Sequence, residues 1–211
     1  MDRAEKPPFD WRDPLLIEDL LDEEERMIRD TARDFAQKRL MPLILDWHRN
    51  ETFDPAIMRE LGEMGFLGMQ IDGYGCAGAS YTAYGLVARE LERVDAAFRS
   101  ACGVQGGLAM TPIHRFGSEA QKQKYLPPMA RGELIGCFGL TEPDAGSDPS
   151  RMRARARTVD GGYRLSGNKV WITHASIADV LIVWARDDNG TGRGFILERG
   201  RSRASFPCAP R

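Results

Sequence analysis

Two segments carry residue types suited to holding a flat, polar ligand. The first, residues 137–148, ends a short apolar run in a loop rich in backbone donors and hydroxyls, where Gly146 allows close approach of the chain. The second, residues 169–173, places the indole of Trp171 and the hydroxyl of Thr173 two residues apart, on one face if this segment is a strand. Each segment alone is also typical of an ordinary turn or an aromatic strand. Together, in this order, they predict a cofactor site.

A second candidate site pairs Glu92 with Arg99, and the two residues share a face if one helix continues between them. Arg99 and Ser100 then offer a cation and a hydroxyl. An arginine fork matches a carboxylate with two parallel hydrogen bonds, and Glu92 could hold the guanidinium in place. The alternative is a surface ion pair worth under about 1 kcal/mol. Spacing alone leaves both interpretations open.

Three other patterns favour structural interpretations. The G-x-G-x-x-G string at residues 73–78 lacks the flanking strand that a dinucleotide site needs, so it indicates a tight loop between helices. The alternating arginines at residues 151–157 are more typical of a solvated strand face than of a nucleic-acid surface. The string Gly146-Ser147-Asp148 does not satisfy the serine-hydrolase motif, and four cysteines without C-x-x-C spacing predict no metal site.

Composition indicates a soluble globular protein. The chain has 211 residues, 42% hydrophobic and 28% charged, with a net charge of −2. Near-neutral charge gives no reason to expect a nucleic-acid partner. The sequence contains no apolar run long enough to span a membrane and begins without an apolar signal core. We therefore expect a cytoplasmic protein with reduced thiols.

Periodicity predicts an α+β fold. Helices are expected at residues 23–40 (ended by Pro42), 55–65, 80–94 and 96–116, and from Ser118 until Pro127 and Pro128 disrupt the last one. Strands are expected at residues 151–157, 163–165, 180–185 and 194–197. The predicted organisation is a helical domain at residues 1–134, an incomplete β domain at residues 135–200 and a disordered tail at residues 201–211.

Both candidate cofactor segments, together with residues 9–15, 72–78 and 88–100, resemble the acyl-CoA dehydrogenase family, and within it the glutaryl-CoA dehydrogenases. The resemblance implies an FAD-dependent enzyme acting on a coenzyme A thioester with a distal carboxylate. It implies cofactor contacts from Phe138, Gly139, Leu140, Thr141, Glu142, Pro143, Asp144, Ala145, Gly146, Ser147, Trp171, Ile172 and Thr173. It implies substrate contacts from Glu92, Arg99, Ser100 and Ser147.

The implied chemistry is proton removal next to the thioester, hydride transfer from the β carbon to the flavin, and loss of carbon dioxide to give crotonyl-CoA. Electron-transfer flavoprotein is the implied oxidant, and the full-length family members are homotetramers. The family's glutamate base lies in a carboxy-terminal bundle, so no residue here is assigned as catalytic, and we expect a truncated chain that is inactive alone. The alternatives are a non-decarboxylating acyl-CoA dehydrogenase and a non-catalytic remnant.

Two features depart from the glutaryl pattern. Gly103, Gly106 and Gly107 stand where that pattern has serines, and glycines in a helix suggest close approach by another element or a ligand. His174 stands where asparagine or serine is expected. A wider or less polar acyl pocket follows.

Overall fold

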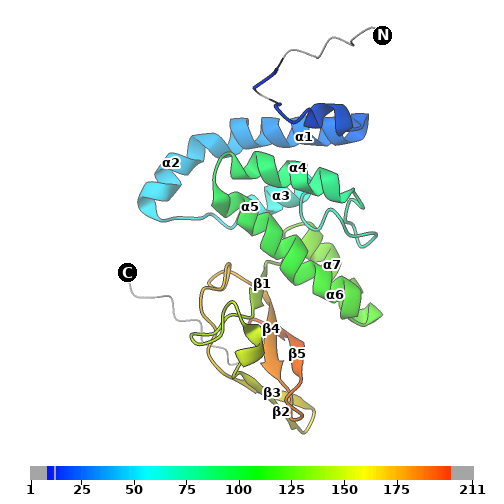
Figure 1. Ribbon diagram of the computed structural model, residues 1–211. Coiled ribbons are helices and arrows are strands. Elements are labelled where there is room, and N and C mark those ends of the chain that lie inside the picture. The colour runs from blue at the N-terminus through cyan, green and yellow to red at the C-terminus, as the bar shows by residue number, and fades with distance from the viewer. Residues whose placement is uncertain (1–8, 12, 201–211) are drawn as a thin grey trace, which may run out of the picture.

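The computed structural model describes residues 9–11 and 13–200, so the tail expected at residues 201–211 lies outside the described part. A helical half precedes a β half (Figure 1), which confirms the α+β prediction. The helices are α1 (Glu23–Phe35), α2 (Met41–Asn50), α3 (Ile57–Glu63), α4 (Tyr81–Glu92), α5 (Ala96–Gly103), α6 (Thr111–Phe116) and α7 (Glu119–Ala130). The strands are β1 (Gly136–Gly139), β2 (Arg155–Val159), β3 (Gly162–Ser166), β4 (Val180–Arg186) and β5 (Gly192–Glu198).

Helices α1 and α2 form one bent rod through a π-helical segment, Ala36–Leu40. The prediction that Pro42 ends this helix is wrong. Pro42 lies in the first turn of α2, where its missing N–H costs little. The wider π turn lets the Met41 N–H bond to the Ala36 carbonyl, so the chain passes the proline without a break.

A second long rod consists of α5, a π-helical segment (Val104–Met110) and α6, as predicted for residues 96–116. A Cβ at Gly106 would lie 2.8 Å from the Gly68 nitrogen, so this glycine permits close contact with the loop after α3. A Cβ at Gly107 would meet nothing within 4 Å. Close approach by another element of the chain is therefore confirmed at Gly106, whereas Gly107 faces open space within this chain.

Helix α7 begins at the predicted capping box, where the Gln121 N–H donates to Ser118 Oγ. The prediction that Pro127 and Pro128 disrupt this helix is wrong, since it continues to Ala130. Leu126 and Met129 are fully buried in this last turn. Their burial holds the turn against the core and offsets the loss of two N–H donors.

Strand β4 is the centre of the sheet. Strand β1 pairs with it in parallel, and β5 pairs with it in antiparallel along its whole length. Strand β2 joins β4 through one parallel pair, Arg155–Arg186, and forms the predicted hairpin with β3. The strand predicted from residue 151 begins only at Arg155, because the N–H groups of Arg153 and Ala154 donate to the Glu142 carboxylate instead.

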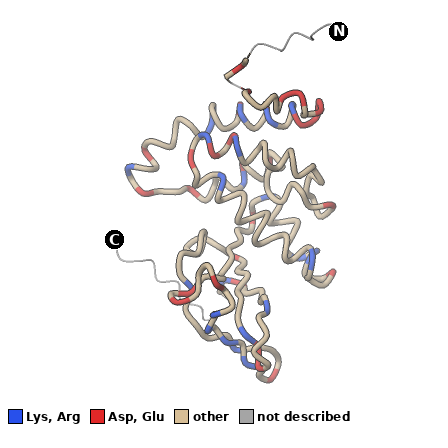
Figure 2. Tube along the Cα trace, viewed as in Figure 1, with Lys and Arg blue, Asp and Glu red and all other residues tan. Residues whose placement is uncertain are grey.

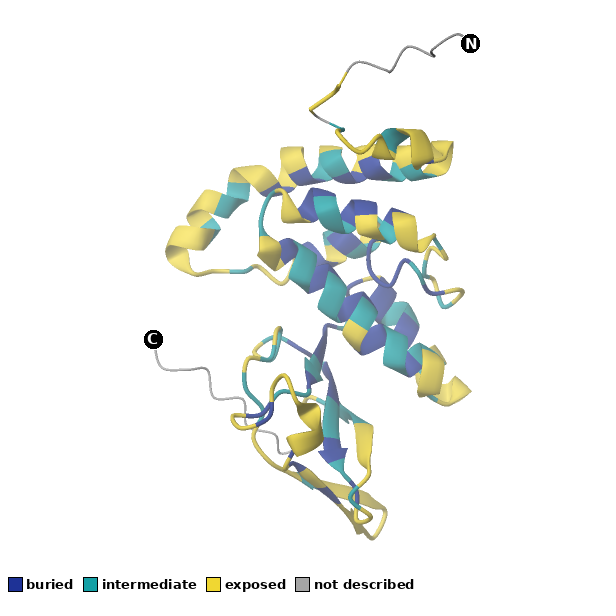
Figure 3. Cartoon of the chain, in the orientation of Figure 1, coloured by how far each residue is buried: buried dark blue, intermediate teal, exposed yellow. Residues whose placement is uncertain are grey.

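Two large cores organise the chain. The first lies among α1, α3, α4 and α5. The second joins α6 and α7 to β4 through fully or nearly fully buried side chains such as Ile113, Leu126 and Ile182, so the two halves pack together (Figure 3). Charges of both signs are spread over both halves (Figure 2). Within the described residues, no helix is long and apolar enough to cross a membrane.

Candidate functional site

The first predicted segment leaves β1 and forms a tight turn. The N–H groups of Glu142 and Ala145 each donate to the other's carbonyl, at 3.0 and 3.1 Å. The side chains of Phe138, Leu140 and Thr141 are half-buried. The exposed residues of the turn and the loop after it are Pro143, Asp144, Gly146 and Ser147, whereas Gly139, Glu142 and Ala145 are buried. The loop therefore presents small and polar residues to solvent, while the residues beneath them are buried.

The second predicted segment is hydrogen-bonded directly to the first. The Val170 N–H donates to the Thr141 carbonyl at 3.0 Å. The Lys169 ammonium donates to the Leu140 carbonyl and to Glu142 Oε1, both at 2.9 Å. The structure thus brings the two sequence segments together as one surface, which we call the paired loops (residues 139–148 and 169–174).

Glu142 lies beneath this surface. Its carboxylate also accepts the N–H groups of Arg153 and Ala154, at 2.6 and 2.9 Å. Burial alone would raise the pKa of Glu142, but the Lys169 ammonium and these two N–H bonds outweigh burial and lower it. Glu142 is therefore an ionised support for the loops, although the sequence motif groups it with residues that contact a cofactor.

Trp171 and Thr173 lie in an irregular loop, so the strand that would align them is absent from this described segment. Trp171 is 92% exposed. Its φ is +58°, and that of His174 is +67°, a left-handed conformation that costs about 1–2 kcal/mol for a residue with a Cβ. Ile172 is half-buried against the β core and anchors the loop. An exposed indole on a strained backbone indicates a role other than packing.

The second candidate pair also meets. Arg99 Nε donates to Glu92 Oε2 at 2.6 Å, with side chains 41% and 47% exposed. One helix does not continue between them, because α4 ends at Glu92 and α5 begins after Asp95, whose carboxylate caps the Ala97 N–H. The contact forms across this break instead. Ser100 is half-buried beside Arg99.

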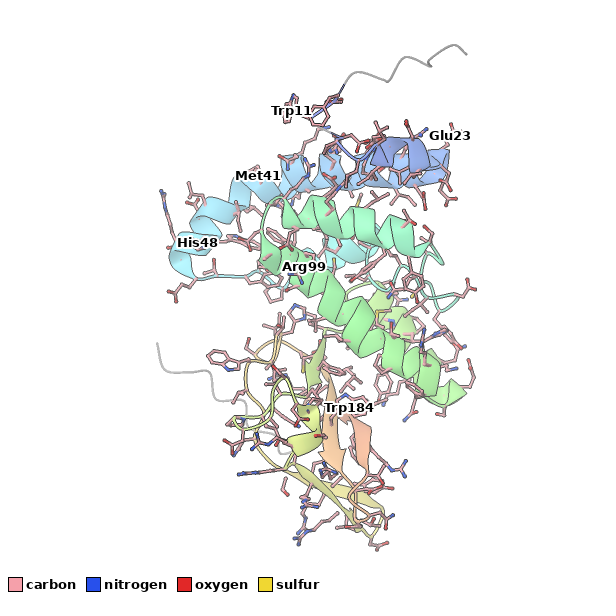
Figure 4. All side chains as sticks on the ribbon, viewed as in Figure 1. Trp11, Glu23, Met41, His48, Arg99 and Trp184 are labelled. Atoms are coloured by element: carbon pink, nitrogen blue, oxygen red, sulfur yellow. The ribbon has the colours of Figure 1, made fainter. Side chains whose placement is uncertain are left out.

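Aromatic contacts connect this pair to the paired loops. Phe98, next to Arg99, is fully buried and its ring lies 6.5 Å from that of Phe53. The Phe53 ring lies 6.1 Å from the imidazole of His174, next to Thr173. Figure 4 shows Arg99 near the start of α5, between the helical layers and the β half. Phe53 therefore links the residues next to Arg99 and next to Thr173 by aromatic contacts.

The other sequence patterns take structural roles. Residues 73–78 connect α3 to α4 in a loop with Gly73, Gly75 and Gly78 at positive φ, and no strand precedes it in the described chain. Ala154 and Ala156 are buried, while the arginines that alternate with them are exposed, as predicted for a solvated face. Within residues 9–11 and 13–200, no group of three or more metal-ligating side chains occurs.

Three residues important for the geometry were missed as individual site residues. Lys169 bridges the paired loops. His174 Nδ1 lies 3.1 Å from the Gly136 carbonyl, and Gln105 is fully buried with three hydrogen bonds. In the sequence, Lys169 stands out only as a lysine beside the aromatic motif, and Gln105 only as a glutamine within an apolar helix. Neither pattern specifies the hydrogen-bond partners of the residue.

Comparison with known proteins identifies the family. Residues 22–133 match the acyl-CoA dehydrogenase N-terminal domain, and residues 137–204 match the middle domain of the same family. The chain belongs to the acyl-CoA dehydrogenase family. This is a family of flavin-dependent oxidoreductases, as the sequence resemblance implies.

Individual relatives agree with this assignment. A glutaryl-CoA dehydrogenase from Mycobacterium smegmatis, solved in complex with FADH2, is 47% identical with a TM-score of 0.85, covering 87% of this chain and 47% of that one. Butyryl-CoA dehydrogenase from Megasphaera elsdenii is 35% identical with a TM-score of 0.79, covering 85% and 49%. An acyl-CoA dehydrogenase of Bacillus subtilis is 35% identical over 84% of this chain and 48% of that protein. The chain thus spans about half the length of these relatives.

Proposed function

We propose that this chain forms the FAD- and acyl-CoA-contacting part of a glutaryl-CoA dehydrogenase. The observation that carries the proposal is the half-exposed guanidinium of Arg99, which lies 2.6 Å from Glu92 and next to Phe98, whose ring is linked through Phe53 to His174 of the paired loops. Because the bond to Glu92 uses Nε, the terminal nitrogens can serve a second carboxylate. The 47% identity to a glutaryl-CoA dehydrogenase supports the choice of substrate.

The residues of the paired loops fit a flavin. Trp171 offers a broad aromatic face that solvent covers in this chain. Covering that face with a flat ring removes apolar area from water, and this gain offsets the strain of the left-handed backbone. Thr141, Ser147 and Thr173 supply hydroxyls beside it, and the exposed loop at Gly146 lets a phosphate approach the backbone.

Each residue then has a stated task. Thr141 would hold the pyrimidine end of a bound flavin by a hydrogen bond, Thr173 would hold the ring from the second loop, and Trp171 would cover one face of the ring. We include Phe138, Gly139, Leu140, Pro143, Asp144, Ala145 and Ile172 in the cofactor surface, with Glu142 beneath it. The chemistry that FAD would supply when bound is that of a hydride acceptor for the β carbon of the acyl thioester.

On the substrate side, Arg99 and Ser100 hold the distal carboxylate, Glu92 orients Arg99, and Ser147 contacts the thioester. Loss of carbon dioxide from the oxidised acyl group gives crotonyl-CoA, and electron-transfer flavoprotein is the proposed electron acceptor. We assign residues 1–134 to the helical domain and residues 135–200 to the middle domain. A homotetramer is the proposed assembly.

The proposal is tested by calorimetric titration of the FAD-loaded chain with glutaryl-CoA and butyryl-CoA. Arg99→Lys should weaken glutaryl-CoA binding by about tenfold or more, because a lysine cannot reproduce the fork and the charged hydrogen bond is worth about 1.5–3 kcal/mol. Butyryl-CoA binding should change by less than about twofold, since it lacks the distal carboxylate.

Arg93→Lys is the matched control, because Arg93 lies just after α4 and pairs with Glu90 instead. It should leave both affinities unchanged. Equal losses on both ligands in Arg99→Lys would contradict the glutaryl assignment and favour a non-decarboxylating acyl-CoA dehydrogenase. The open space at Gly107 is the observation that keeps this alternative in view.

A further inference from the structure

Gly136, the first residue of β1, has both backbone polar groups bonded to side chains from distant parts of the chain. Its N–H donates to Gln105 Oε1 at 2.7 Å. Its carbonyl oxygen lies 3.1 Å from His174 Nδ1. We refer to Gln105, Gly136 and His174 as the Gly136 junction. The two side chains come from opposite sides, one from the helical half and one from the paired loops.

The Gln105 side of the junction is rigid. This side chain is fully buried in the π-helical segment. Its Nε2 donates to the carbonyls of Met129 and Leu134, at 2.9 and 2.8 Å. One amide therefore bonds to the end of α7, the connection to the sheet and the first strand. Both of its donors and its oxygen are used, so the amide has a single favourable orientation.

The close packing around Gly136 leaves the junction little freedom. A Cβ at this position would lie 2.5 Å from Ala109 Cβ and 2.7 Å from Met129 Cε. The end of the Met129 side chain could move, but Ala109 Cβ is fixed to the backbone, so only glycine lets β1 approach the π-helical segment this closely. Any shift of β1 would break the Gln105 bond or create an overlap. Gly136 is therefore a fixed point between the two halves.

On the other side of the junction, His174 connects Gly136 to the paired loops. Because the Gly136 carbonyl oxygen can only accept a hydrogen bond, Nδ1 of His174 carries the proton when this bond forms. The ring also contacts Phe53 of the helical half, at 6.1 Å between centroids. His174 follows Thr173 directly, and its carbonyl accepts the Ile177 and Ala178 N–H groups at 2.9 and 2.8 Å. Its ring and backbone thus hold the loop end that carries Trp171 and Thr173.

We propose that Gln105 and His174 are positioning residues that act through Gly136. They set the place of the Trp171–Thr173 loop relative to the helix that carries Arg99, so they fix the geometry between the two candidate sites. What the loop binds rests on the proposed function, whereas the junction itself rests on the contacts above. His174 acts here through its Nδ1–H bond more than through its aromatic ring.

Two variants of His174 separate the hydrogen bond from the ring. His174→Phe keeps an aromatic ring against Phe53 and removes the donor. His174→Asn removes the ring but keeps an N–H donor, and asparagine tolerates the left-handed backbone found at this position. A positioning role through the hydrogen bond therefore predicts rescue by asparagine and none by phenylalanine.

The measurement is amide hydrogen exchange on the purified chain, read by mass spectrometry. Residues 169–177 and 134–141 should exchange at least about tenfold faster in His174→Phe, and within about threefold of wild type in His174→Asn. Helix α4 should be unchanged in both and serves as the internal standard. Equal exchange in wild type and His174→Phe would overturn the proposal. Failure of His174→Asn to rescue would assign the effect to ring packing and overturn it as well.

Gln105→Glu tests the other side of the junction. A carboxylate can still accept the Gly136 N–H but cannot donate to Met129 and Leu134. Exchange should then accelerate at residues 134–141 and also at residues 169–177. Acceleration confined to residues 134–141 would remove Gln105 from the proposal. If this variant does not fold, the His174 pair still decides.

FAD affinity, measured by flavin fluorescence, provides the functional readout. His174→Phe should bind FAD about tenfold more weakly, and His174→Asn should bind it as wild type does. If wild type itself does not bind FAD, the proposed function fails, while the exchange measurement still decides the junction. If wild type binds FAD and both variants bind it equally well, the junction does not position the loop for the cofactor.

Discussion

The Lys169–Glu142 ion pair of the paired loops and the Arg99–Glu92 ion pair are both close, but they differ in burial. Lys169 and Glu142 are 12% and 6% exposed and lie 2.9 Å apart. Arg99 and Glu92 are 41% and 47% exposed and lie 2.6 Å apart. The shorter contact is the more solvated one. Distance alone therefore does not reveal what a pair does.

Burial decides the role of each ion pair, because it decides whether a charged side chain can leave its partner at low cost. Glu142 and Lys169 have exchanged water for each other and for the backbone groups of Leu140, Arg153 and Ala154, so separating them exposes an uncompensated buried charge. Arg99 retains access to water and can trade its partner for another anion. The first arrangement is suited to holding a surface in shape, and the second to binding a charged ligand.

The largest predicted effect comes from breaking the buried pair. Lys169→Met should lower the free energy of unfolding by about 3–5 kcal/mol, because Glu142 is left charged and buried without its cation. Urea unfolding monitored by circular dichroism measures the change. Lys38→Met is the matched control: Lys38 and Asp34 form a 2.7 Å pair that is mostly exposed, and its loss should cost about 0.5 kcal/mol or less.

A double-mutant cycle on Lys169 and Glu142 can isolate the effect of the buried charge. The double variant Lys169→Met with Glu142→Gln removes both charges and should recover part of the loss. Equal destabilisation by Lys169→Met and Lys38→Met would mean that burial does not distinguish the two kinds of pair, and the comparison would fail.

A smaller effect tests whether the helical side of the site is equally constrained. Gly106→Ala should destabilise the chain by about 1–3 kcal/mol, because its Cβ would press on the Gly68 backbone. Gly107→Ala should be neutral or stabilising by up to about 1 kcal/mol, since its Cβ enters open space and alanine favours a helix. Thermal unfolding compares the two. Equal losses would mean that both glycines serve the helix in the same way.

These glycines also mark what could be predicted from the sequence. Periodicity and caps predicted most of the helices and strands, because each depends on residues within a few positions of one another, but they did not predict α2 or β1. The predictions at Pro42 and Pro127 failed, because a π turn in one case and a buried last turn in the other compensate for the missing donors. Compensation by packing is a tertiary property that local rules do not contain.

The site was predictable as segments but not as contacts. The motifs indicated that residues 137–148 and 169–173 belong to one surface, and the structure joins them by hydrogen bonds. No spacing rule links Gln105 to Gly136 or Gly136 to His174, since these bonds connect residues 31 and 38 positions apart. Likewise, no spacing rule links Glu142 to the N–H groups of Arg153 and Ala154 or to the Lys169 ammonium, which its carboxylate accepts.

The response to pH should reveal His174 directly. Burial lowers the pKa of His174 from its ordinary value of 6.5, while the bond to the Gly136 carbonyl opposes this. At a pH between the pKa of His174 in the folded chain and its pKa in the unfolded chain, the unfolded chain binds more protons. The free energy of unfolding therefore falls as pH decreases below about 6.5. Urea unfolding at about pH 7.5 and pH 5.5 should show this loss in wild type and a smaller one in His174→Asn.

The buried carboxylates of Glu142 and Asp187 do not obscure this window. Glu142 and Asp187 have lowered pKa values, so their contributions are lost only at more acidic pH. A pH response of the same size in wild type and His174→Asn would show that other groups titrate in its place.

The smallest effect is expected at the exposed pair, and it tests the other half of the comparison. Glu92→Gln should lower the free energy of unfolding by less than about 1 kcal/mol, because both partners keep their contact with water. Glu60→Gln is the matched control, since Glu60 pairs with Arg39 at 2.7 Å with similar exposure. A loss above about 2 kcal/mol in Glu92→Gln alone would make the pair structural and leave Arg99 committed to Glu92. A small loss in stability combined with weaker glutaryl-CoA binding would instead show that Glu92 orients Arg99 without contributing to folding. Glu92 would then matter only when Arg99 has a carboxylate to hold.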